Sequence, residues 1–394
     1  MDKITSISDV VWFQEGPGVR NTQYTTEGVK LLNVANLVDG EVDLSNTNRY
    51  ISEEEAYGKY KHFLVDEGDL IIASSGIKVD YFDKKMGFIK AEHLPLCMNT
   101  STIRFKTLNA DVLDIRYFMY FLKSESFKQQ LAVQITGSAQ LNFGPSHLKK
   151  MSVKMVPIAQ QKEIVHNLSE IDRLISYRQQ QLIKLDELVK SRFIELFGDI
   201  VLNPFNWEKD TLGKACDVRD GTHDSPQYYE IGYPLVTSKN VTSGKIDVTG
   251  CSLICEADYK KINERSKVDM GDIIMPMIGT VGNPVIVDVE PNFAIKNVAL
   301  IKFRLNSRVL NIYVRALLES DYFDDAVLSK VRGGTQKFIS LGDIRKLEIL
   351  VPPMELQEQF ATFVKQTDKS KLAVQQSLEK LETLKKSLMQ QYFG

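Results

Sequence analysis

The feature that most restricts how this chain can fold is an internal repeat. Residues 184–198 read KLDELVKSRFIELFG, and residues 380–394, the last fifteen, read KLETLKKSLMQQYFG. When the sequence is shifted by 196 positions, the two copies stay in register without a gap from Gly137 on Gly333 to Gly198 on Gly394. About a quarter of these 62 positions are identical. The chain is therefore two copies of one unit, and its fold must be one that occurs twice.

The upstream part of each copy matches more loosely. Residues 28–43 (GVKLLNVANLVDGEVD) match residues 232–247 (GYPLVTSKNVTSGKID) at a shift of 204. The segments VDEGDLII (65–72) and VDMGDIIM (268–275) match at 203, and NTSTIRF (99–105) and NVALIKF (297–303) match at 198. The changing shift indicates shared strands joined by loops of different length. Each unit of about 195 residues is thus a variable globular part followed by a better-matched tail.

The tail has the pattern of a long helix with one apolar face. Apolar residues recur at spacings of three, four and seven, which is the alternation of a heptad seam. In the first copy they are Ile164, Leu168, Ile171, Ile175, Leu182, Leu185, Val189 and Leu196. In the second copy they are Phe360, Val364, Val374, Leu378, Leu381, Leu388 and Tyr392. The second seam has weak points at Thr367, Lys371 and Lys385.

Prolines before each seam and a glycine after it indicate where the helices start and stop. Pro157 and the pair Pro352 and Pro353 suit a helix start, and Gly198 and Gly394 suit a helix end. A helix of roughly 36–40 residues would be about 55–60 Å long and could not bury its seam alone. We therefore expect the two helices to pack on each other, although the heptads leave parallel and antiparallel pairing open. The alternative is a surface helix on each globular domain.

The globular parts are expected to mix strands and helices in a soluble protein. Short β-rich runs such as GDLIIASS and GDIIMPMI are divided by turn residues, and each set precedes one helical run. Within the first helical run we expect the aromatic residues Tyr117, Phe118 and Phe121 to face a core. The composition, with 43% hydrophobic and 25% charged residues, is typical of globular proteins. With no apolar leader and four scattered cysteines, we expect reduced thiols, no membrane span and a cytoplasmic location.

Motifs for catalysis are missing from the sequence. It has no G-x-x-x-x-G-K-[ST] phosphate loop, no G-x-G-x-x-G unit and no H-E-x-x-H pair. The string NPF at 203–205 lacks the second proline of an amino-methyltransferase turn, and the five histidines are scattered. No pair of carboxylates stands out. The sequence therefore predicts a binding protein without a catalytic, cofactor or metal site.

The doubled order of globular part and long helix resembles the specificity (S) subunit of type I restriction–modification systems. That family has a Pro-Pro-Leu-x-Glu-Gln type of sequence at the start of each long helix. Here Pro352, Pro353, Met354, Leu356 and Gln357 match it except that glutamate is missing, and Val156, Pro157, Ile158, Gln160 and Gln161 match it with one proline fewer and glutamine for glutamate. The stretches from Gly137 to Gln140 and from Gly334 to Gln336, and the strands at Gly68 and Gly271, also resemble the family. The resemblance covers essentially the whole chain.

The resemblance implies a fold class and a division into domains. The fold would be α+β, with two globular α/β target recognition domains separated by two long antiparallel coiled-coil helices in a pseudo-twofold internal repeat. The expected domains are recognition domain 1 at 1–155, spacer helix 1 at 156–200, recognition domain 2 at 201–350 and spacer helix 2 at 351–394. Each recognition domain would read one half of a bipartite target in double-stranded DNA.

The same resemblance implies partners that supply the chemistry. Two methylation (M) subunits would dock on the helices, bring S-adenosylmethionine and flip an adenine out of the duplex. Restriction (R) subunits would add ATP- and Mg-dependent translocation and cleavage. The chain itself would carry no cofactor and perform no catalysis. A specificity subunit of a type IIG-like or other methyltransferase system, and a coiled-coil scaffold that does not bind DNA, are the alternatives.

Polar and basic side chains in glycine-rich loops are the candidates for DNA contact, because loops carry binding groups on a rigid frame. Arg, Asn and Gln suit base edges, whereas Lys, Ser and Thr more often hold phosphates. In the first domain they are Arg20, Asn21, Thr22, Gln23, Tyr24, Ser74, Ser75, Lys78, Tyr81, Lys84, Lys85, Ser138, Gln140 and Asn142. In the second they are Arg219, Thr222, His223, Ser225, Gln227, Tyr228, Lys239, Arg332, Thr335, Gln336 and Lys337.

Neither globular part is basic as a whole. Residues 1–150 hold 17 Lys and Arg against 19 Asp and Glu, and residues 207–350 hold 19 against 20. Because phosphate neutralisation supplies much of the affinity for DNA, we expect the isolated chain to bind DNA modestly. Partner subunits would supply much of the remaining positive charge.

Overall fold

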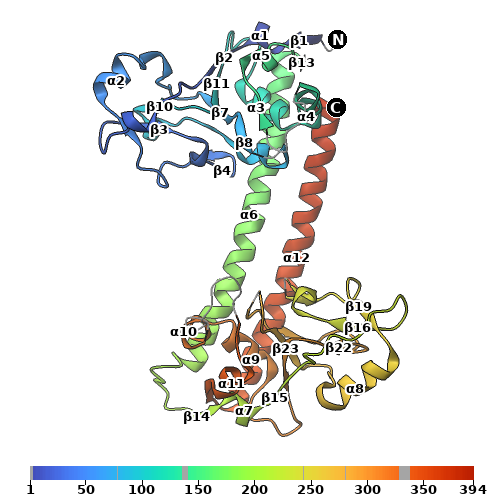
Figure 1. Cartoon of the computed structure of the whole chain (residues 1–394). Helices are drawn as coiled ribbons and strands as arrows, with labels where there is room; N and C mark the ends of the chain where they lie inside the picture. The colour runs from blue at the N-terminus through green and yellow to red at the C-terminus, as the bar shows by residue number, and fades with distance from the viewer. Residues whose placement is uncertain (1–2, 78, 135–140, 243, 280, 328–337) are drawn as a thin grey trace. The chain divides into compact units, whose positions relative to one another are not determined.

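The computed structural model of the chain describes residues 3–77, 79–134, 141–242, 244–279, 281–327 and 338–394 (Figure 1). It divides into two compact units: unit 1 is Met1–Tyr177 with Ser377–Gly394, and unit 2 is Arg178–Gln376. Both divisions fall inside the long helices α6 (Ile158–Phe197) and α12 (Met354–Phe393). Each unit therefore contains one globular part, the start of the helix that follows it and the end of the other helix.

Unit 1 is built on a four-stranded antiparallel sheet and a three-stranded sheet. The first has the order β2 (Val11–Glu15), β11 (Thr102–Thr107), β7 (Leu70–Ala73), β9 (Met86–Phe88), and the second has the order β10 (Leu96–Met98), β3 (Val29–Leu32), β6 (Tyr50–Ile51). Three strand pairs complete the unit: β1 (Lys3–Ser6) with β13 (Ser152–Met155), β4 (Leu37–Val38) with β5 (Glu41–Val42), and β8 (Ser75–Ile77) with β12 (Leu141–Asn142). Its short helices are α1 (Ile7–Val10), α2 (Glu53–Tyr57), α3 (Ile115–Lys123), α4 (Glu125–Gln134) and α5 (Pro145–Leu148).

Unit 2 repeats this arrangement almost strand for strand. Its sheets have the orders β15 (Asp217–Asp220), β23 (Val298–Lys302), β20 (Ile273–Pro276), β21 (Val285–Ile286) and β19 (Ser252–Ile254), β16 (Tyr233–Val236), β22 (Ala294–Ile295). The pairs are β14 (Glu208–Thr211) with β24 (Glu348–Val351) and β17 (Val241–Thr242) with β18 (Lys245–Ile246). Its short helices are α7 (Leu212–Ala215), α8 (Glu256–Ser266), α9 (Asn311–Leu318), α10 (Asp321–Ala326) and α11 (Leu341–Lys346).

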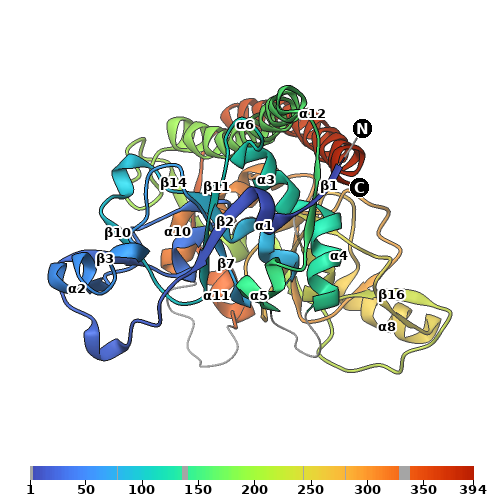
Figure 2. The same ribbon diagram turned by 90° about the horizontal axis from the view of Figure 1, so that it is seen from above.

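In unit 1, helix α3 lies between the four-stranded sheet and the long helices, as the view from above shows (Figure 2). The ring of Phe118 lies 5.3 Å from that of Phe105 on β11, and the ring of Tyr117 lies 5.0 Å from that of Phe393 on α12. Tyr117, Phe118 and Phe121 are all buried, as the sequence predicted. Helix α3 thus packs its aromatic side chains on the sheet on one side and on α12 on the other, and this packing joins the two in unit 1.

The long helices run antiparallel within each unit. In unit 1, Asp172 of α6 pairs with Lys385 of α12 at 2.6 Å, and Asn167 donates to the Tyr392 hydroxyl at 3.4 Å. As the residue number rises on one helix it therefore falls on the other. This confirms the antiparallel pairing that the family resemblance implied.

Unit 2 shows the same direction with its own contacts. Asp186 of α6 pairs with Lys371 of α12 at 2.5 Å, and the rings of Phe193 and Phe360 lie 5.6 Å apart. Lys371 and Lys385 looked like defects in the second seam, but each faces an aspartate of the opposite helix. These pairs favour one register, because any other alignment would separate the charges.

The ends of the two long helices are buried more deeply than the heptad seam predicted. Phe197 and Phe393, which correspond to each other in the repeat, are 0% and 2% exposed. Phe393 belongs to the core of unit 1, and Phe197 belongs to the core of unit 2. The repeated Phe-Gly ending therefore closes the core of the unit that contains the other globular part.

One buried glutamine in each unit fixes the globular part to the start of its own long helix. Gln161 accepts a hydrogen bond from the backbone N–H of Asp114 and donates to the carbonyls of Val112 and Val156 at 2.9 and 2.8 Å. Gln357 repeats all three bonds with Leu310, Arg308 and Pro352 in unit 2. Both glutamines are fully buried. They satisfy backbone groups that would otherwise be unpaired where the chain enters the helix.

Candidate nucleic-acid interface

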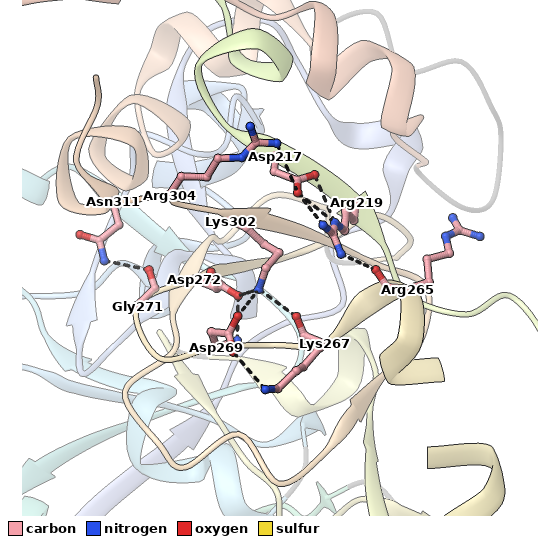
Figure 3. A network of polar contacts seen from close by, with 10 residues as sticks. All are labelled: Asp217, Arg219, Arg265, Lys267, Asp269, Gly271, Asp272, Lys302, Arg304 and Asn311. Carbon is pink, nitrogen blue, oxygen red and sulfur yellow. Dashed lines mark hydrogen bonds and ion pairs between the residues drawn. The ribbon is translucent and has the colours of Figure 1, made fainter. Parts of the chain in front are cut away.

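A turn with two aspartates and a lysine recurs beside the main sheet of both units. In unit 2, Lys302 of β23 donates to Asp272 at 2.6 Å and to Asp269 at 2.8 Å (Figure 3). The backbone N–H of Asp269 donates to Asp272 at 2.8 Å, and Gly271 has a φ of 85°, which favours glycine. The hydrogen bond from Lys302 lowers the pKa of Asp269, whereas burial raises the pKa of Asp272. The turn supports the start of the inner strand β20, and its charges are satisfied internally.

Unit 1 builds the same turn with an additional cation. The pairing of β11 with β7 and of β23 with β20 sets the shift between these strands at 196, so the shift of 198 predicted from the sequence is wrong and Lys302 is the counterpart of Lys106. Lys106 pairs with Asp69 at 3.3 Å and also with Asp66, as Lys302 pairs with both aspartates in unit 2. Arg104 adds a second contact to Asp69 at 3.3 Å, and its guanidinium lies 4.9 Å from the ring of Trp12. This difference shows that the shared turn tolerates different neighbours on the same strand.

The loop after β2 presents the first group of predicted DNA-contact residues. Arg20, Asn21 and Thr22 are exposed. Gln23 is turned inward, because its amide donates to Glu55 at 2.7 Å and to the Tyr60 hydroxyl at 3.1 Å. The hydroxyl of the partly buried Tyr24 accepts from the buried Asn99 at 3.3 Å. Gln23 and Tyr24 therefore hold the loop, and the three residues before them are available for contact.

A second group in unit 1 meets around β8 and β12. The Ser75 hydroxyl lies 2.6 Å from that of Ser101, and Asn142 of β12 is the strand partner of Ser75. Ser74, in contrast, is buried, and its backbone bonds to Ser101 and Phe143, so its side chain does not face solvent. The structure thus places Ser75 and Asn142 opposite each other on paired strands, as is expected of two residues that belong to one binding surface.

The remaining predictions in unit 1 are spread out. Tyr81 is 54% exposed. Lys84 pairs with Asp39 at 3.6 Å, and Lys85 donates to the Leu37 carbonyl at 2.7 Å, so Lys85 has a structural bond. The candidates Lys78, Ser138 and Gln140 lie outside the described residues.

In unit 2 the loop after β15 carries a polar network. His223 contacts Asp220 through Nε2 at 2.8 Å and the Asn297 amide oxygen through Nδ1 at 2.9 Å. The Ser225 hydroxyl accepts from Lys296 at 2.7 Å. The Thr222 hydroxyl accepts from the Asp224 N–H at 3.1 Å, which stabilises the turn. The loop is therefore held in place while its polar side chains stay at the surface.

The other predictions in unit 2 have mixed surroundings. Arg219 is engaged by Asp217 at 2.6 Å, which raises the arginine pKa and lowers the aspartate pKa. Gln227, Tyr228 and Lys239 are exposed. The candidates Arg332, Thr335, Gln336 and Lys337 lie outside the described residues.

Sequence reasoning missed several residues that join these loops. Asn99 in unit 1, and Lys296 and Asn297 in unit 2, connect the loop after the first sheet strand to the rest of the sheet. Ser101 in unit 1 contacts Ser75 of β8. Their signal was present, because they open or precede the matched segments NTSTIRF and NVALIKF. The segments have the pattern of strands, and that pattern alone does not single out the polar residues at their starts.

Two kinds of feature are absent from the described part of the chain. No cluster of three or more His, Cys, Asp or Glu side chains there has an arrangement that could hold a metal ion. In that same part, none of the helices combines the length and the apolar character needed to cross a membrane.

Comparison with known proteins identifies the family. A sequence model of the family described as "Type I restriction modification DNA specificity domain" matches residues 9–187 and again residues 204–384. The chain belongs to this family and contains two such domains. The two matches correspond to the two copies of the repeat.

Curated relatives and solved structures are similar over most of the chain. The type I restriction enzyme MjaVIII specificity subunit of Methanocaldococcus jannaschii is 24% identical over 84% of this chain and 79% of that protein. The type I restriction enzyme EcoKI specificity subunit of Escherichia coli is 20% identical over 82% of this chain and 74% of that protein. The crystal structure of the S subunit from M. genitalium matches with a TM-score of 0.57 at 16% identity, over 100% of this chain and 96% of that one. A chain from a study of type I R-M complex assembly matches at 0.59 and 15% identity, over 100% and 97%. These solved structures support the fold.

Proposed function

We propose that this chain is the DNA sequence-specificity subunit of a type I restriction–modification complex. Each unit would read one half of a bipartite target in double-stranded DNA. The observation that carries the proposal is the contrast between a repeated framework and unlike polar loops. Two related frameworks are expected if both units bind double-stranded DNA, and different loops are expected if each unit reads a different base sequence.

The loops after β2 and β15 are the best candidates for reading bases. They occupy equivalent places, because the N–H of Gly16 bonds to Thr102 and the N–H of Gly221 bonds to Val298, 196 residues later. Yet the residues that follow are Arg20 and Asn21 in unit 1, and His223 and Ser225 in unit 2. Arginine and asparagine side chains match guanine and adenine edges in the major groove.

The proposal assigns the chemistry to partner subunits. Two methylation subunits would dock on the long helices and bring S-adenosylmethionine, and restriction subunits would bring ATP and Mg. This chain would select the sequence and perform no bond-making step itself. Membership of the family and the relatives' names support this division of labour.

The decisive test is modification mapping of genomic DNA with this gene present and deleted. We expect a bipartite motif with two defined halves to carry methylated adenine only when the gene is present. Arg20→Ala with Asn21→Ala should relax one half of that motif, and His223→Ala with Ser225→Ala should relax the other.

Lys260→Ala, on the exposed side of α8 and paired with Glu256 at 2.7 Å, serves as the control and should leave both halves intact. A single continuous motif, or relaxation of both halves by either loop variant, would contradict the assignment of one half to each unit. A complete lack of gene-dependent methylation would favour a scaffold that does not act on DNA.

A further inference from the structure

Unit 2 contains a cavity of about 420 Å³ where α7 leads into β15. Its lining includes the chain from Gly213 to Val218, the turn from Arg304 to Arg308, and Arg345 of α11. Among these residues are four cationic side chains, Lys214, Arg304, Arg308 and Arg345, and one carboxylate, Asp217.

Among the described residues, Arg308 is the cavity cation that carboxylates neutralise most fully, because it pairs with Glu208 at 2.7 Å and Asp210 at 2.8 Å. Arg345 donates from Nε and Nη2 to the carbonyl of Val218, which carries no charge. The side chain of Arg304 is 76% exposed, and its guanidinium lies 4.0 Å from Asp217, which already accepts from Arg219. An anionic group in the cavity would therefore meet an excess of donors.

Two residues of the cavity lining, Arg304 and Asp217, begin a line of charged side chains beside β15. Figure 3 shows Arg304, Asp217, Arg219 and Arg265 in succession along this strand. The side chain of Arg265 is 66% exposed and pairs with Asp220, and Arg219 is fixed beside it by a bond to the Arg265 carbonyl at 2.8 Å. Arg265 also lines a second cavity of about 220 Å³, together with Thr222, Ser225 and Lys261 and with the carboxylates Asp224 and Asp258. The arginine line thus connects the first cavity to the loop proposed to read bases.

The length of this line suits a DNA strand. Asp217 and Thr222 are five residues apart, which is about 16 Å along an extended strand at roughly 3.3 Å per residue. Phosphates of one DNA strand are spaced about 3.4 Å along the helix axis and farther apart along the strand itself, so a line of this length spans a few phosphates. Guanidinium and ammonium groups donate charge-assisted hydrogen bonds to phosphate oxygens.

Unit 1 keeps only one of the four cavity cations at the matching positions. There the counterparts of Lys214, Arg304 and Arg308 are Asp9, Leu108 and Val112, and the counterpart of Arg345 is Lys149. Leu108 is 56% exposed and Val112 is 46% exposed. The repeated framework does not require the cations, and a docking surface common to both copies would not differ in this way. The additional positive charge is therefore specific to unit 2 and to the ligand that this unit binds.

We propose that this basic line, defined as Lys214, Arg304, Arg219, Arg265 and Lys261, binds backbone phosphates of double-stranded DNA next to the half-site read by unit 2. The inference rests on the proposed function and adds to it. It makes the two halves of the target unequal: unit 2 contributes more of the salt-sensitive, sequence-independent binding, and unit 1 contributes less.

The experiment measures DNA affinity against salt concentration for the complete complex with its methylation subunits. The variant Lys214→Ala with Arg304→Ala removes two cations from exposed positions. Because each neutralised phosphate contributes about 0.9 to the slope of log K against log salt, the slope should become less steep by about 1.8. The methylated motif should not change. Arg304→Lys should keep most of the slope, because it keeps the charge.

The matched control is Lys245→Ala with Lys260→Ala, which makes the same change of net charge at exposed positions of β18 and α8. It should leave the slope near that of the wild type. Thermal unfolding of each variant verifies that unit 2 is folded. Arg304→Gln alone is a milder substitution on which the same salt slope can be measured.

Three results would overturn the inference. One is an unchanged slope in Lys214→Ala with Arg304→Ala. Another is loss of methylation subunits from the purified complex, which would assign the cavity to an acidic protein surface. The third is inorganic phosphate binding that the variant abolishes while its DNA slope stays unchanged, which would indicate a small-anion site. If the proposed function itself fails, the wild-type complex will show no preference for any bipartite sequence.

Discussion

Units 1 and 2 agree most closely in their buried polar bonds and differ most at their surfaces. The Tyr117 hydroxyl donates to the carbonyl of Lys154, and the Tyr313 hydroxyl donates to that of Leu350, 196 residues later in both cases. Gln161 and Gln357 repeat three bonds each, as described above. Buried polar groups must be satisfied, so a change in one partner is costly, whereas exposed loop residues are free to vary. The comparison separates what holds a unit together from what it presents to a ligand.

The contrast is sharpest along the first strand of the main sheet. Trp12 occupies in unit 1 the place that Asp217 occupies in unit 2, since both pair with the matching lysines Lys106 and Lys302 across the sheet. The aromatic ring covers Arg104, whereas the carboxylate binds Arg219. The same framework thus accommodates an apolar neighbour in one unit and a charged one in the other.

The largest expected effect tests whether each unit depends on the far end of the other repeat. Phe393→Ala should destabilise unit 1, and Phe197→Ala should destabilise unit 2, each by about 3–5 kcal/mol, because a fully buried aromatic ring leaves a cavity. Hydrogen exchange measured separately on the sheets of the two units would detect the loss. It should be confined to one unit in each variant.

Leu384→Ala is the control, since Leu384 lies on α12 but is 47% exposed. It should change exchange in either sheet by little. If Phe393→Ala weakened unit 2 as strongly as unit 1, the assignment of each helix end to one core would be wrong.

A loss of stability of intermediate size is expected when the lysine of either aspartate turn is replaced, and the loss should differ between the two units. Lys302→Met removes the cation bonded to Asp272, whose side chain is 5% exposed, and Leu300 stands where unit 1 has Arg104. We expect a loss of about 3 kcal/mol in unit 2. Lys106→Met should cost unit 1 only about 1 kcal/mol, because Arg104 still contacts Asp69.

The measurement is again hydrogen exchange, on β7 and β20. Lys267→Met, at a position whose side chain is 72% exposed, should have almost no effect on either strand. Equal losses for Lys106→Met and Lys302→Met would show that Arg104 does not compensate.

The smallest effect concerns acid stability. The hydrogen bond from Arg219 lowers the pKa of Asp217 below its ordinary value of 3.8. A carboxyl group whose pKa is lower in the folded state stabilises the fold above its unfolded pKa, and this contribution is lost as the pH falls through the folded pKa. Asp217→Asn should therefore remove less than about 1 kcal/mol at neutral pH and flatten the acid limb below about pH 4. Trp12→Phe, at the matching place in unit 1, should leave the shape of that limb unchanged.

Much of the fold could be predicted from sequence because its signals are periodic. The shift of 196 and the heptads located the repeat and both long helices, and the burial of Tyr117 and Phe118 followed from the helical pattern. The candidate interface could be predicted less well. Gln23 and Ser74 have the polar character of contact residues, but one is bonded inward and the other is buried. Composition does not reveal which way a polar side chain points.

The sequence by itself determined that the chain contains one framework twice, that each copy ends in a long helix, and that the polar loops of the two copies differ. Those properties reside in local periodicity and in matching residues. Only the tertiary structure decided that Lys371 and Lys385 face aspartates, that Phe197 and Phe393 close the cores beside the opposite globular parts, and that Arg304, Arg219 and Arg265 line up along one strand. These are contacts between residues far apart in the chain, and only packing specifies which distant partners meet.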